Sequence, residues 1–285
     1  MRIIRFGAPD QEKPGVILDD GSRIDVSGFG QDFDEDFFGA GGLVRLAAWV
    51  KQNGARAPRV DDGVRLGPPA CRPSKIVGVG LNYHEHAREQ GIDPPKEPIL
   101  FMKATTSYCG PNDDLRIPRG SRKTDWEIEL AVVIGRRATY VEKADALSHV
   151  AGYAILNDVS EREFQIERGG QWDKGKGCDT FAPFGPWIAT TEELDFGNLK
   201  MWLTVNGERK QEGSTSDMIF DVPTLVSYIS QFMTLLPGDI ISTGTPPGVG
   251  AFAKPPTFLA PGDIVEAGID GLGQSRRRVV GPSEA

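Results

Sequence analysis

Trp126-Glu127-Ile128-Glu129-Leu130-Ala131-Val132 is the stretch with the clearest structural signal in the chain. In a β-strand, alternation sends Glu127 and Glu129 to one face and Ile128, Leu130 and Val132 to the other. Two neighbouring carboxylates repel each other unless they face bulk water or a cation. The pattern therefore predicts either a solvated edge strand or a site for Mg²⁺ or Mn²⁺, which prefer oxygen ligands.

Strand signals dominate the rest of the chain as well. Its 35 glycines and 21 prolines favour many turns and short strands over a helix bundle. Asn206-Gly207 and Asp270-Gly271 are hairpin signals that follow apolar runs. The expected strands cover residues 2–6, 15–18, 75–80, 130–134, 150–156, 201–205, 239–242 and 263–269. The sequence predicts a strand-rich α+β fold.

Helices and domain boundaries are less prominent. One helix is expected over residues 43–51, and Asp221 caps a second one. Residues at helical spacing in the second helix are interpreted as core packing: Leu225, Tyr228, Ile229 and Phe232. A loop rich in Pro and Gly at 67–73 predicts a small N-terminal α+β domain over residues 1–70 and a second domain over residues 71–285.

Composition narrows the functional classes. The chain has 285 residues, 39% hydrophobic and 25% charged, which is typical of a globular protein. Its net charge is −8 and no basic face is evident, so we expect no nucleic-acid partner, and Arg276 to Arg278 is interpreted as a solvated strand. No signal peptide and no run of roughly 18 apolar residues is present, so a cytoplasmic protein without a membrane partner is expected. The odd, scattered cysteines favour reduced thiols.

Asp158 is a third candidate metal ligand. It follows the apolar strand expected at 150–156, and functional residues often lie at strand ends. Three carboxylates would leave half of an octahedral shell for water and substrate. Ser160 to Glu163 then fits a capping box, which places Arg162 and Gln165 on one face of a helix that could hold a substrate carboxylate. A helix cap and an ordinary surface helix are the alternatives.

Two of the three histidines lie in Asn82 to Gly91. On a short helix there, His86 and Glu89 are three residues apart and can contact each other, giving an imidazole that can activate water. A zinc site is the alternative, but the His84 to His86 spacing does not match the thermolysin type. Lys174 and Lys176 lie in a glycine-rich loop that could approach a ligand. The glycine motifs near residues 78 and 244 lack the patterns of nucleotide-binding loops.

In order, these segments resemble the fumarylacetoacetate hydrolase family from residue 75 to residue 269. Matching motifs include Phe101-Met102-Lys103, Gly110-Pro111 and Gly152-Tyr153. The resemblance implies a C-terminal catalytic domain of mixed strands rolled into a barrel-like body, a smaller N-terminal domain, and a homodimer.

The resemblance also implies roles for single residues. It assigns Glu127, Glu129 and Asp158 as ligands of Mg²⁺ or Mn²⁺. It assigns His86 and Glu89 as the water-activating pair. The active-site lysine is matched to Lys176 rather than Lys174 because Gly-Cys-Asp-Thr follows it. Arg162, Gln165 and Thr245 match positions that contact the oxo-acid end of the ligand.

Substrate expectations come from two further segments. Gln11 to Gly15 and Thr105 to Tyr108 look like members that act on 2,4-diketo-3-deoxy sugar acids of the L-rhamnonate or L-fuconate type. The implied reaction is hydrolysis of the C3–C4 bond of a 2,4-dioxo acid to pyruvate and a hydroxy acid such as lactate. The alternatives are an oxaloacetate decarboxylase, a hydroxyhepta-dienedioate isomerase or decarboxylase, a ureidoglycolate lyase, and a non-enzymatic, metal-dependent binder of oxo acids.

Overall fold

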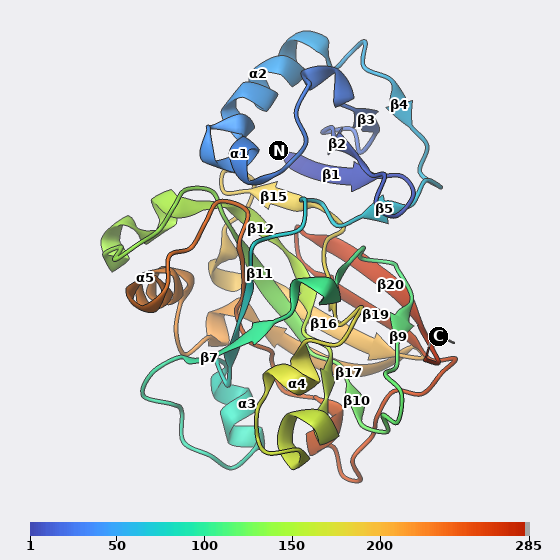
Figure 1. Ribbon diagram of the computed structural model, residues 1–285, viewed down its shortest axis with the longest axis vertical. Helices are drawn as coiled ribbons and strands as arrows, with labels where there is room; N and C mark the ends of the chain where they lie inside the picture. The colour runs from blue at the N-terminus through green and yellow to red at the C-terminus, as the bar shows by residue number, and fades with distance from the viewer. Residues whose placement is uncertain (283–285) are drawn as a thin grey trace.

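The computed structural model describes residues 1–282 (Figure 1). Its strands are β1 (Arg2–Phe6), β2 (Lys13–Ile17), β3 (Arg23–Asp25), β4 (Arg59–Val60), β5 (Leu66–Gly67), β6 (Ile76–Gly80), β7 (Ile99–Lys103), β8 (Tyr108–Cys109), β9 (Leu115–Arg116), β10 (Thr124–Asp125), β11 (Ile128–Ile134), β12 (Val150–Asn157), β13 (Ser160–Glu161), β14 (Ala182–Pro183), β15 (Ile188–Thr190), β16 (Lys200–Val205), β17 (Glu208–Ser214), β18 (Ile240–Ser242), β19 (Ile264–Ile269) and β20 (Gly273–Val280).

The α-helices are α1 (Glu35–Gly39), α2 (Gly42–Asn53), α3 (His84–Glu89), α4 (Asp173–Lys176) and α5 (Val222–Phe232). Shorter helical turns are η1 (Ser27–Phe29), η2 (Thr105–Ser107), η3 (Lys143–His149), η4 (Glu163–Glu167, a π-helix), η5 (Phe196–Asn198), η6 (Thr215–Asp217) and η7 (Gly250–Phe252). These elements confirm the strand-rich α+β fold and all eight expected strands, with small shifts at their ends. Within residues 1–282, no helix has both the length and the apolar character of a membrane span.

One large sheet runs through both lobes of the molecule. Its strand order is β4-β3-β2-β1-β15-β12-β11-β18-β6-β7, and β5 pairs with β1. The N-terminal strands form the upper lobe in Figure 1, and β1 joins them to the lower body by pairing antiparallel with β15. A hydrogen-bonded ladder therefore crosses the predicted boundary at residue 70, and the division of the chain into two folding units remains a prediction.

β11 lies between two hydrophobic cores. Leu130 and Val132 pack in a core that includes Leu203 of β16, a strand of the second sheet β17-β16-β19-β20-β9. Ala131 and Val133 pack on the opposite side, in a core shared with the N-terminal lobe. Every residue of β11 is buried, and the strand pairs with β12 and β18. The solvated edge strand is therefore wrong, and the glutamates beside these apolar residues lie in the interior.

Two expectations about exposure need correction. On α5, Asp221 caps the helix by accepting from Thr224 N–H at 2.9 Å, as expected. Phe232 is not a core residue, because it ends the helix past the core and is 63% exposed. On β20, Arg276 and Arg278 are exposed, whereas strand alternation turns Arg277 inward, where it is 2% exposed. The run of arginines is thus a strand that is solvated on one face only.

The capping box predicted at Ser160 to Glu163 does not form. Ser160 and Glu161 belong to β13, which pairs with β10, and the helical turn after them is the π-helix η4. Ser160 Oγ donates to the carbonyl of Asp158 at 2.9 Å instead of accepting a helix N–H. Tertiary pairing with β10 overrides the local capping signal, yet Arg162 and Gln165 still come to lie together.

Candidate active site

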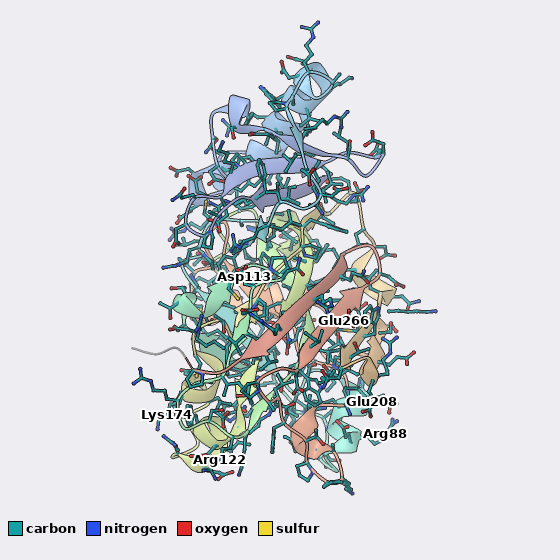
Figure 2. The ribbon with its side chains drawn as sticks, turned by 90° about the vertical axis from the view of Figure 1, so that its right-hand side faces the viewer. Arg88, Asp113, Arg122, Lys174, Glu208 and Glu266 are labelled. Carbon is teal, nitrogen blue, oxygen red and sulfur yellow. The ribbon has the colours of Figure 1, made fainter. Side chains whose placement is uncertain are left out.

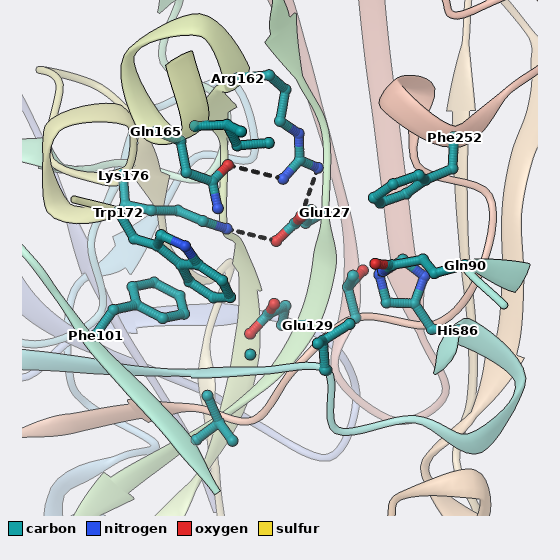
Figure 3. A pocket seen from close by; sticks show the side chains of 15 residues that line it. His86, Gln90, Phe101, Glu127, Glu129, Arg162, Gln165, Trp172, Lys176 and Phe252 are labelled. Carbon is teal, nitrogen blue, oxygen red and sulfur yellow. Dashed lines mark hydrogen bonds and ion pairs between the residues drawn. The ribbon is translucent and has the colours of Figure 1, made fainter. Parts of the chain in front are cut away.

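A cavity of about 130 Å³ opens in the lower body, between α3 and the segments η4 and α4 (Figure 3). It is where most of the predicted site residues meet. The residues that line it are Val79, Gly80, Leu81, His86, Gln90, Phe101, Glu127, Glu129, Arg162, Gln165, Ile166, Trp172, Lys176, Thr245 and Phe252. Its floor carries charged groups, and much of its remaining wall is aromatic or aliphatic.

Three buried carboxylates meet at the floor of this cavity, where Glu127 and Glu129 line it and Asp158 lies behind them. The β11–β12 register pairs Ile128 with Asn157, so Glu127 and Asp158 lie next to each other where the two strands begin and end. Asp158 N–H donates to the carbonyl of Glu127 at 2.7 Å, which fixes that arrangement. Glu127, Glu129 and Asp158 each offer an oxygen atom, and these atoms lie within 4.8 Å of one another.

This cluster of three carboxylates fits a divalent cation. Asp158 Oδ1 is buried and accepts no hydrogen bond, and Glu129 Oε1 has no hydrogen-bond donor among residues 1–282. Burial, followed by the nearby carboxylates of Asp158 and Glu127, raises the pKa of Glu129 well above its usual value. Oxygen-only ligands with excess negative charge suit Mg²⁺ or Mn²⁺ rather than zinc. These atoms are therefore the ones that would hold the metal.

Two buried lysines lie against the same carboxylates. Lys176 Nζ is 2.7 Å from Glu127 Oε2 and 2.5 Å from Asp158 Oδ2. Burial opposes its charge, but Asp158 and Glu127 outweigh that effect and raise the pKa of Lys176, so it stays protonated at neutral pH. Lys103 Nζ is 2.6 Å from Asp158 Oδ1, in an ion pair without hydrogen-bond geometry. Lys174 instead lies at the surface, where it donates to the carbonyl of Arg168 at 2.6 Å (Figure 2).

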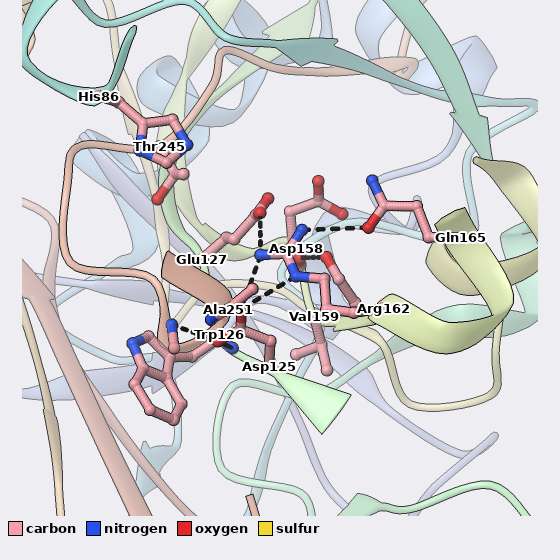
Figure 4. Close-up of polar contacts among 12 residues, drawn as sticks. His86, Asp125, Trp126, Glu127, Asp158, Val159, Arg162, Gln165, Thr245 and Ala251 are labelled. Carbon is pink, nitrogen blue, oxygen red and sulfur yellow. Dashed lines mark hydrogen bonds and ion pairs between the residues drawn. The ribbon is translucent and has the colours of Figure 1, made fainter. Parts of the chain in front are cut away.

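Arg162 bridges three acidic or polar side chains beside the lysines (Figure 4). Its Nε donates to Asp125 Oδ2 at 2.9 Å, its Nη2 to Glu127 Oε1 at 2.6 Å, and its Nη1 to Gln165 Oε1 at 3.1 Å. Burial alone would raise the pKa of Glu127, but Lys176 and Arg162 lower it far below the usual value. A guanidinium has five N–H groups. One Nη1 hydrogen and the Gln165 amide nitrogen therefore have no acceptor among residues 1–282, and both residues line the cavity.

His86 and Glu89 form the predicted pair on the opposite side of the cavity. His86 Nδ1 lies 2.9 Å from Glu89 Oε2, and Glu89 Oε1 accepts from Gly248 N–H at 3.0 Å. With the proton on Nδ1 facing the carboxylate, Nε2 carries a lone pair, and the Gln90 amide nitrogen lies 2.8 Å from it. Phe252 packs edge-on against the imidazole, with ring centroids 5.9 Å apart. The imidazole is thus held in one orientation by groups on three sides.

Thr245 lines the cavity but has little hydrogen-bonding capacity left. Its hydroxyl donates to the carbonyl of Ile128 at 2.8 Å and accepts from Gln211 Nε2 at 2.8 Å. A ligand could meet only its remaining lone pair. Its contact with the oxo-acid end of the ligand stays a prediction.

Comparison with known proteins identifies the family of this chain. Residues 75–280 match the family model described as fumarylacetoacetate (FAA) hydrolase C-terminal. The chain belongs to the fumarylacetoacetate hydrolase family. A protein of Burkholderia multivorans, provisionally named as a hydrolase, is 52% identical over 276 residues, covering 96% of this chain and 97% of that protein. Membership makes the chain a hydrolase or isomerase.

Solved structures of the family agree with the fold. A fumarylacetoacetate hydrolase from Exiguobacterium antarcticum is 35% identical, covers 99% of each chain and has a TM-score of 0.85. A probable 2-hydroxyhepta-2,4-diene-1,7-dioate isomerase from Mycobacterium abscessus is 34% identical, covers 100% of each chain and has a TM-score of 0.82. A maleylpyruvate hydrolase from Sphingobium sp. SYK-6, in complex with manganese(II) and pyruvate, is 30% identical, covers 99% of this chain and 100% of that one, and has a TM-score of 0.82.

These comparisons support a divalent metal in the family, as the manganese complex illustrates. They also confirm the family resemblance read from the sequence. The names of these relatives do not include a sugar-acid hydrolase, so that closer resemblance remains a prediction.

Four residues of the site escaped the sequence analysis as functional candidates: Gln90, Lys103, Asp125 and Phe252. Lys103 ends the motif Phe101-Met102-Lys103. A lysine that is buried in an apolar strand usually has a charged partner. Gln90 follows His86 by four residues, so helical spacing alone could have identified it. Phe252 could not be identified, because only the folded chain brings the 248–252 segment to α3.

Proposed function

We propose that this protein is a metal-dependent hydrolase that cleaves the C3–C4 bond of a 2,4-dioxo acid, with a 2,4-diketo-3-deoxy sugar acid of the L-rhamnonate or L-fuconate type as substrate. One observation carries the proposal. His86, held by Glu89, faces the cavity from one side, and the group formed by Glu127, Arg162 and Lys176 faces it from the other (Figure 3). Hydrolysis needs a water-activating base and an electron-accepting end that are separated by the length of the reacting unit.

Glu127, Glu129 and Asp158 would hold Mg²⁺ or Mn²⁺, which when bound acts as a Lewis acid toward the 2-oxo group. The chain's own groups then recognise the acid end. The unpaired Nη1 hydrogen of Arg162 and the amide of Gln165 donate to the C1 carboxylate. The ammonium of Lys176 places a positive charge beside the 2-oxo end.

His86 acts at the other end of the reacting unit. Water displaces the Gln90 amide from Nε2, and Nε2 then takes a proton from that water. Glu89 stabilises the imidazolium, and the water oxygen bonds to C4. The C3–C4 bond then breaks, and its electron pair goes toward the C2 carbonyl, where the charge of Lys176 stabilises it in the transition state. C3 receives the proton, so the products are pyruvate and a hydroxy acid such as lactate, and water balances the reaction.

The cavity wall supports a substrate with an uncharged tail. Lys176 and Arg162 are the cations that line it, and both are already engaged by carboxylates of the chain. The rest of the wall includes aromatic and aliphatic side chains: Leu81, Phe101, Ile166, Trp172 and Phe252. Because burying a second substrate carboxylate without a partner is unfavourable, this wall favours a neutral tail over a dicarboxylate.

Isomerisation of a hydroxyhepta-dienedioate is the second candidate, supported by similarity to the Mycobacterium abscessus protein. Purified protein with Mg²⁺ or Mn²⁺ separates the two when given both 2,4-diketo-3-deoxy sugar acids, maleylpyruvate and 2-hydroxyhepta-2,4-dienedioate. We expect pyruvate release from the sugar acids, with kcat/KM well above that for the dicarboxylates. A shift in the ultraviolet spectrum of the dienedioate without pyruvate release from any substrate would refute the hydrolase proposal.

A further inference from the structure

Asp125 is a fully buried carboxylate that contacts two separate parts of the site. On one side, its Oδ2 accepts from Arg162 Nε at 2.9 Å, and Arg162 Nη2 lies 2.8 Å from the same oxygen. On the other side, it binds the turn η7: Oδ1 accepts from Gly250 N–H at 2.7 Å and Oδ2 from Ala251 N–H at 2.9 Å. Its own neighbour Trp126 supplies a further N–H at 2.8 Å.

The turn that Asp125 binds reaches the water-activating pair. Gly248 donates its N–H to Glu89, and Phe252 packs against the ring of His86. Trp126 Nε1 donates to the carbonyl of Gly248 at 3.1 Å, which ties the start of the segment to the same strand end. The segment 248–252 therefore links α3 to Asp125 through hydrogen bonds and one aromatic contact.

The close approach at Gly250 indicates that this arrangement needs a specific backbone. A Cβ atom at residue 250 would lie 2.0 Å from the carbonyl of Thr257 and 2.8 Å from Asp125 Oδ1. Only glycine therefore allows the turn to descend onto the carboxylate. Figure 4 shows Asp125 between Ala251 and Arg162.

We propose that Asp125 is the positioning residue that couples the acid-binding end of the cavity to the water-activating end. One carboxylate fixes both the guanidinium of Arg162 and the turn that orients His86 and Glu89. Asp125 does not face the cavity, so it acts through these groups rather than on the substrate. The assignment of one end as acid-binding and the other as water-activating rests on the proposed hydrolase function. The coupling between the two ends can be measured by oxalate binding alone.

Asp125→Asn tests the coupling with little change in shape. The amide replaces one acceptor oxygen by a donor, which then faces N–H groups of the turn or of Arg162. In Mg²⁺-loaded protein, we expect the affinity for oxalate, a small mimic of the acid end, to fall roughly 10-fold to 100-fold. Calorimetry should show Mg²⁺ or Mn²⁺ affinity within a few-fold of wild type, since no proposed ligand is changed.

Double variants separate positioning from general destabilisation. The fold-losses in oxalate affinity caused by Asp125→Asn and Arg162→Lys should combine to less than their product, because both substitutions act on the contact between one carboxylate and one guanidinium. The kcat defects of Asp125→Asn and Phe252→Ala should likewise combine to less than their product. Defects that multiply, or an Asp125→Asn protein with wild-type oxalate affinity and kcat, would overturn the inference and leave the hydrolase proposal intact.

Asp239→Asn is the matched control. Asp239 is equally buried, accepts from Lys75 and Leu236 N–H groups at 3.1 and 2.7 Å, and does not line the cavity. We expect this variant to lower Tm as Asp125→Asn does while keeping wild-type oxalate affinity. An equal loss of oxalate affinity in both variants would show that the Asp125 effect is only general destabilisation.

Hydrogen exchange in the wild-type protein gives a test that does not depend on the folding of Asp125→Asn. With Mg²⁺ present, oxalate should slow amide exchange in a peptide covering residues 248–252. The protection should be smaller in Arg162→Lys at saturating oxalate. Unchanged exchange on adding oxalate to wild type, or equal protection in Arg162→Lys, would contradict the coupling whether or not any dioxo acid is hydrolysed.

Discussion

Replacing His86 by alanine removes the group that we assign to water activation. A positioned acid–base group contributes roughly 10²–10⁴-fold in rate. Each factor of ten corresponds to about 1.36 kcal/mol, so the barrier should rise by about 2.7–5.4 kcal/mol. The structure limits the cost in stability. Glu89 keeps its bond to Gly248 and its side chain is 25% exposed, so the change strands no buried charge. It should cost about 1 kcal/mol for each of the two lost hydrogen bonds, to Glu89 and to Gln90.

The assay is pyruvate release under saturating substrate, with metal affinity measured on the same preparation. His84→Ala is the matched control, because His84 is exposed on the same helix and does not line the cavity. It should keep near-wild-type activity. If the protein also decarboxylates oxaloacetate, that reaction needs no attacking water and should suffer much less in His86→Ala. Equal losses in both reactions, or hydrolysis within a few-fold of wild type, would refute the role of His86.

Three further outcomes follow from the floor of the cavity. Glu129→Gln should weaken Mn²⁺ binding by at least the roughly 10–100-fold seen for loss of an outer-shell partner; unchanged affinity in calorimetry would remove it from the ligand set. Arg162→Lys should weaken oxalate inhibition by about 1.5–3 kcal/mol, because lysine cannot reproduce the fork; an unchanged inhibition constant would exclude the contact. In the metal-free folded state, the pKa of Glu129 lies above its unfolded-state value near 4.5. Its protonated form therefore contributes stability that is fully present below about pH 4.5 and is lost as pH rises through the folded-state pKa. Since metal replaces the proton, Mn²⁺ should raise Tm more at pH 8 than at pH 5.5, and a pH-independent increment would contradict this.

Local patterns predicted those parts of the site that short-range geometry determines. Strand alternation brought Glu127 and Glu129 together, and a spacing of three residues on a short helix brought His86 to Glu89. The position of Asp158 followed from its place just beyond a strand, which the β11–β12 register sets beside Glu127. These predictions needed only the periodicity of one element at a time.

Other parts depend on pairings between distant segments. Arg162 and Asp125 are separated by 37 positions, and β1 meets β15 almost 190 residues later in the chain. The capping box at Ser160 failed for the same reason, because β10 competes for that backbone. Single-sequence patterns contain no information on which distant strands pair. The homodimer, the cytoplasmic location and the domain division at residue 70 remain predictions.

Hydrolysis in ¹⁸O-labelled water tests the central claim most directly. Protein stripped of metal and reconstituted with Mg²⁺ or Mn²⁺ would be given the diketo-deoxy sugar acid, and both products analysed by mass spectrometry. The account predicts one ¹⁸O atom in the carboxylate of the hydroxy acid, formed only by the reconstituted protein, because water attacks C4. An unlabelled hydroxy acid, or equal turnover by the stripped protein, would contradict it.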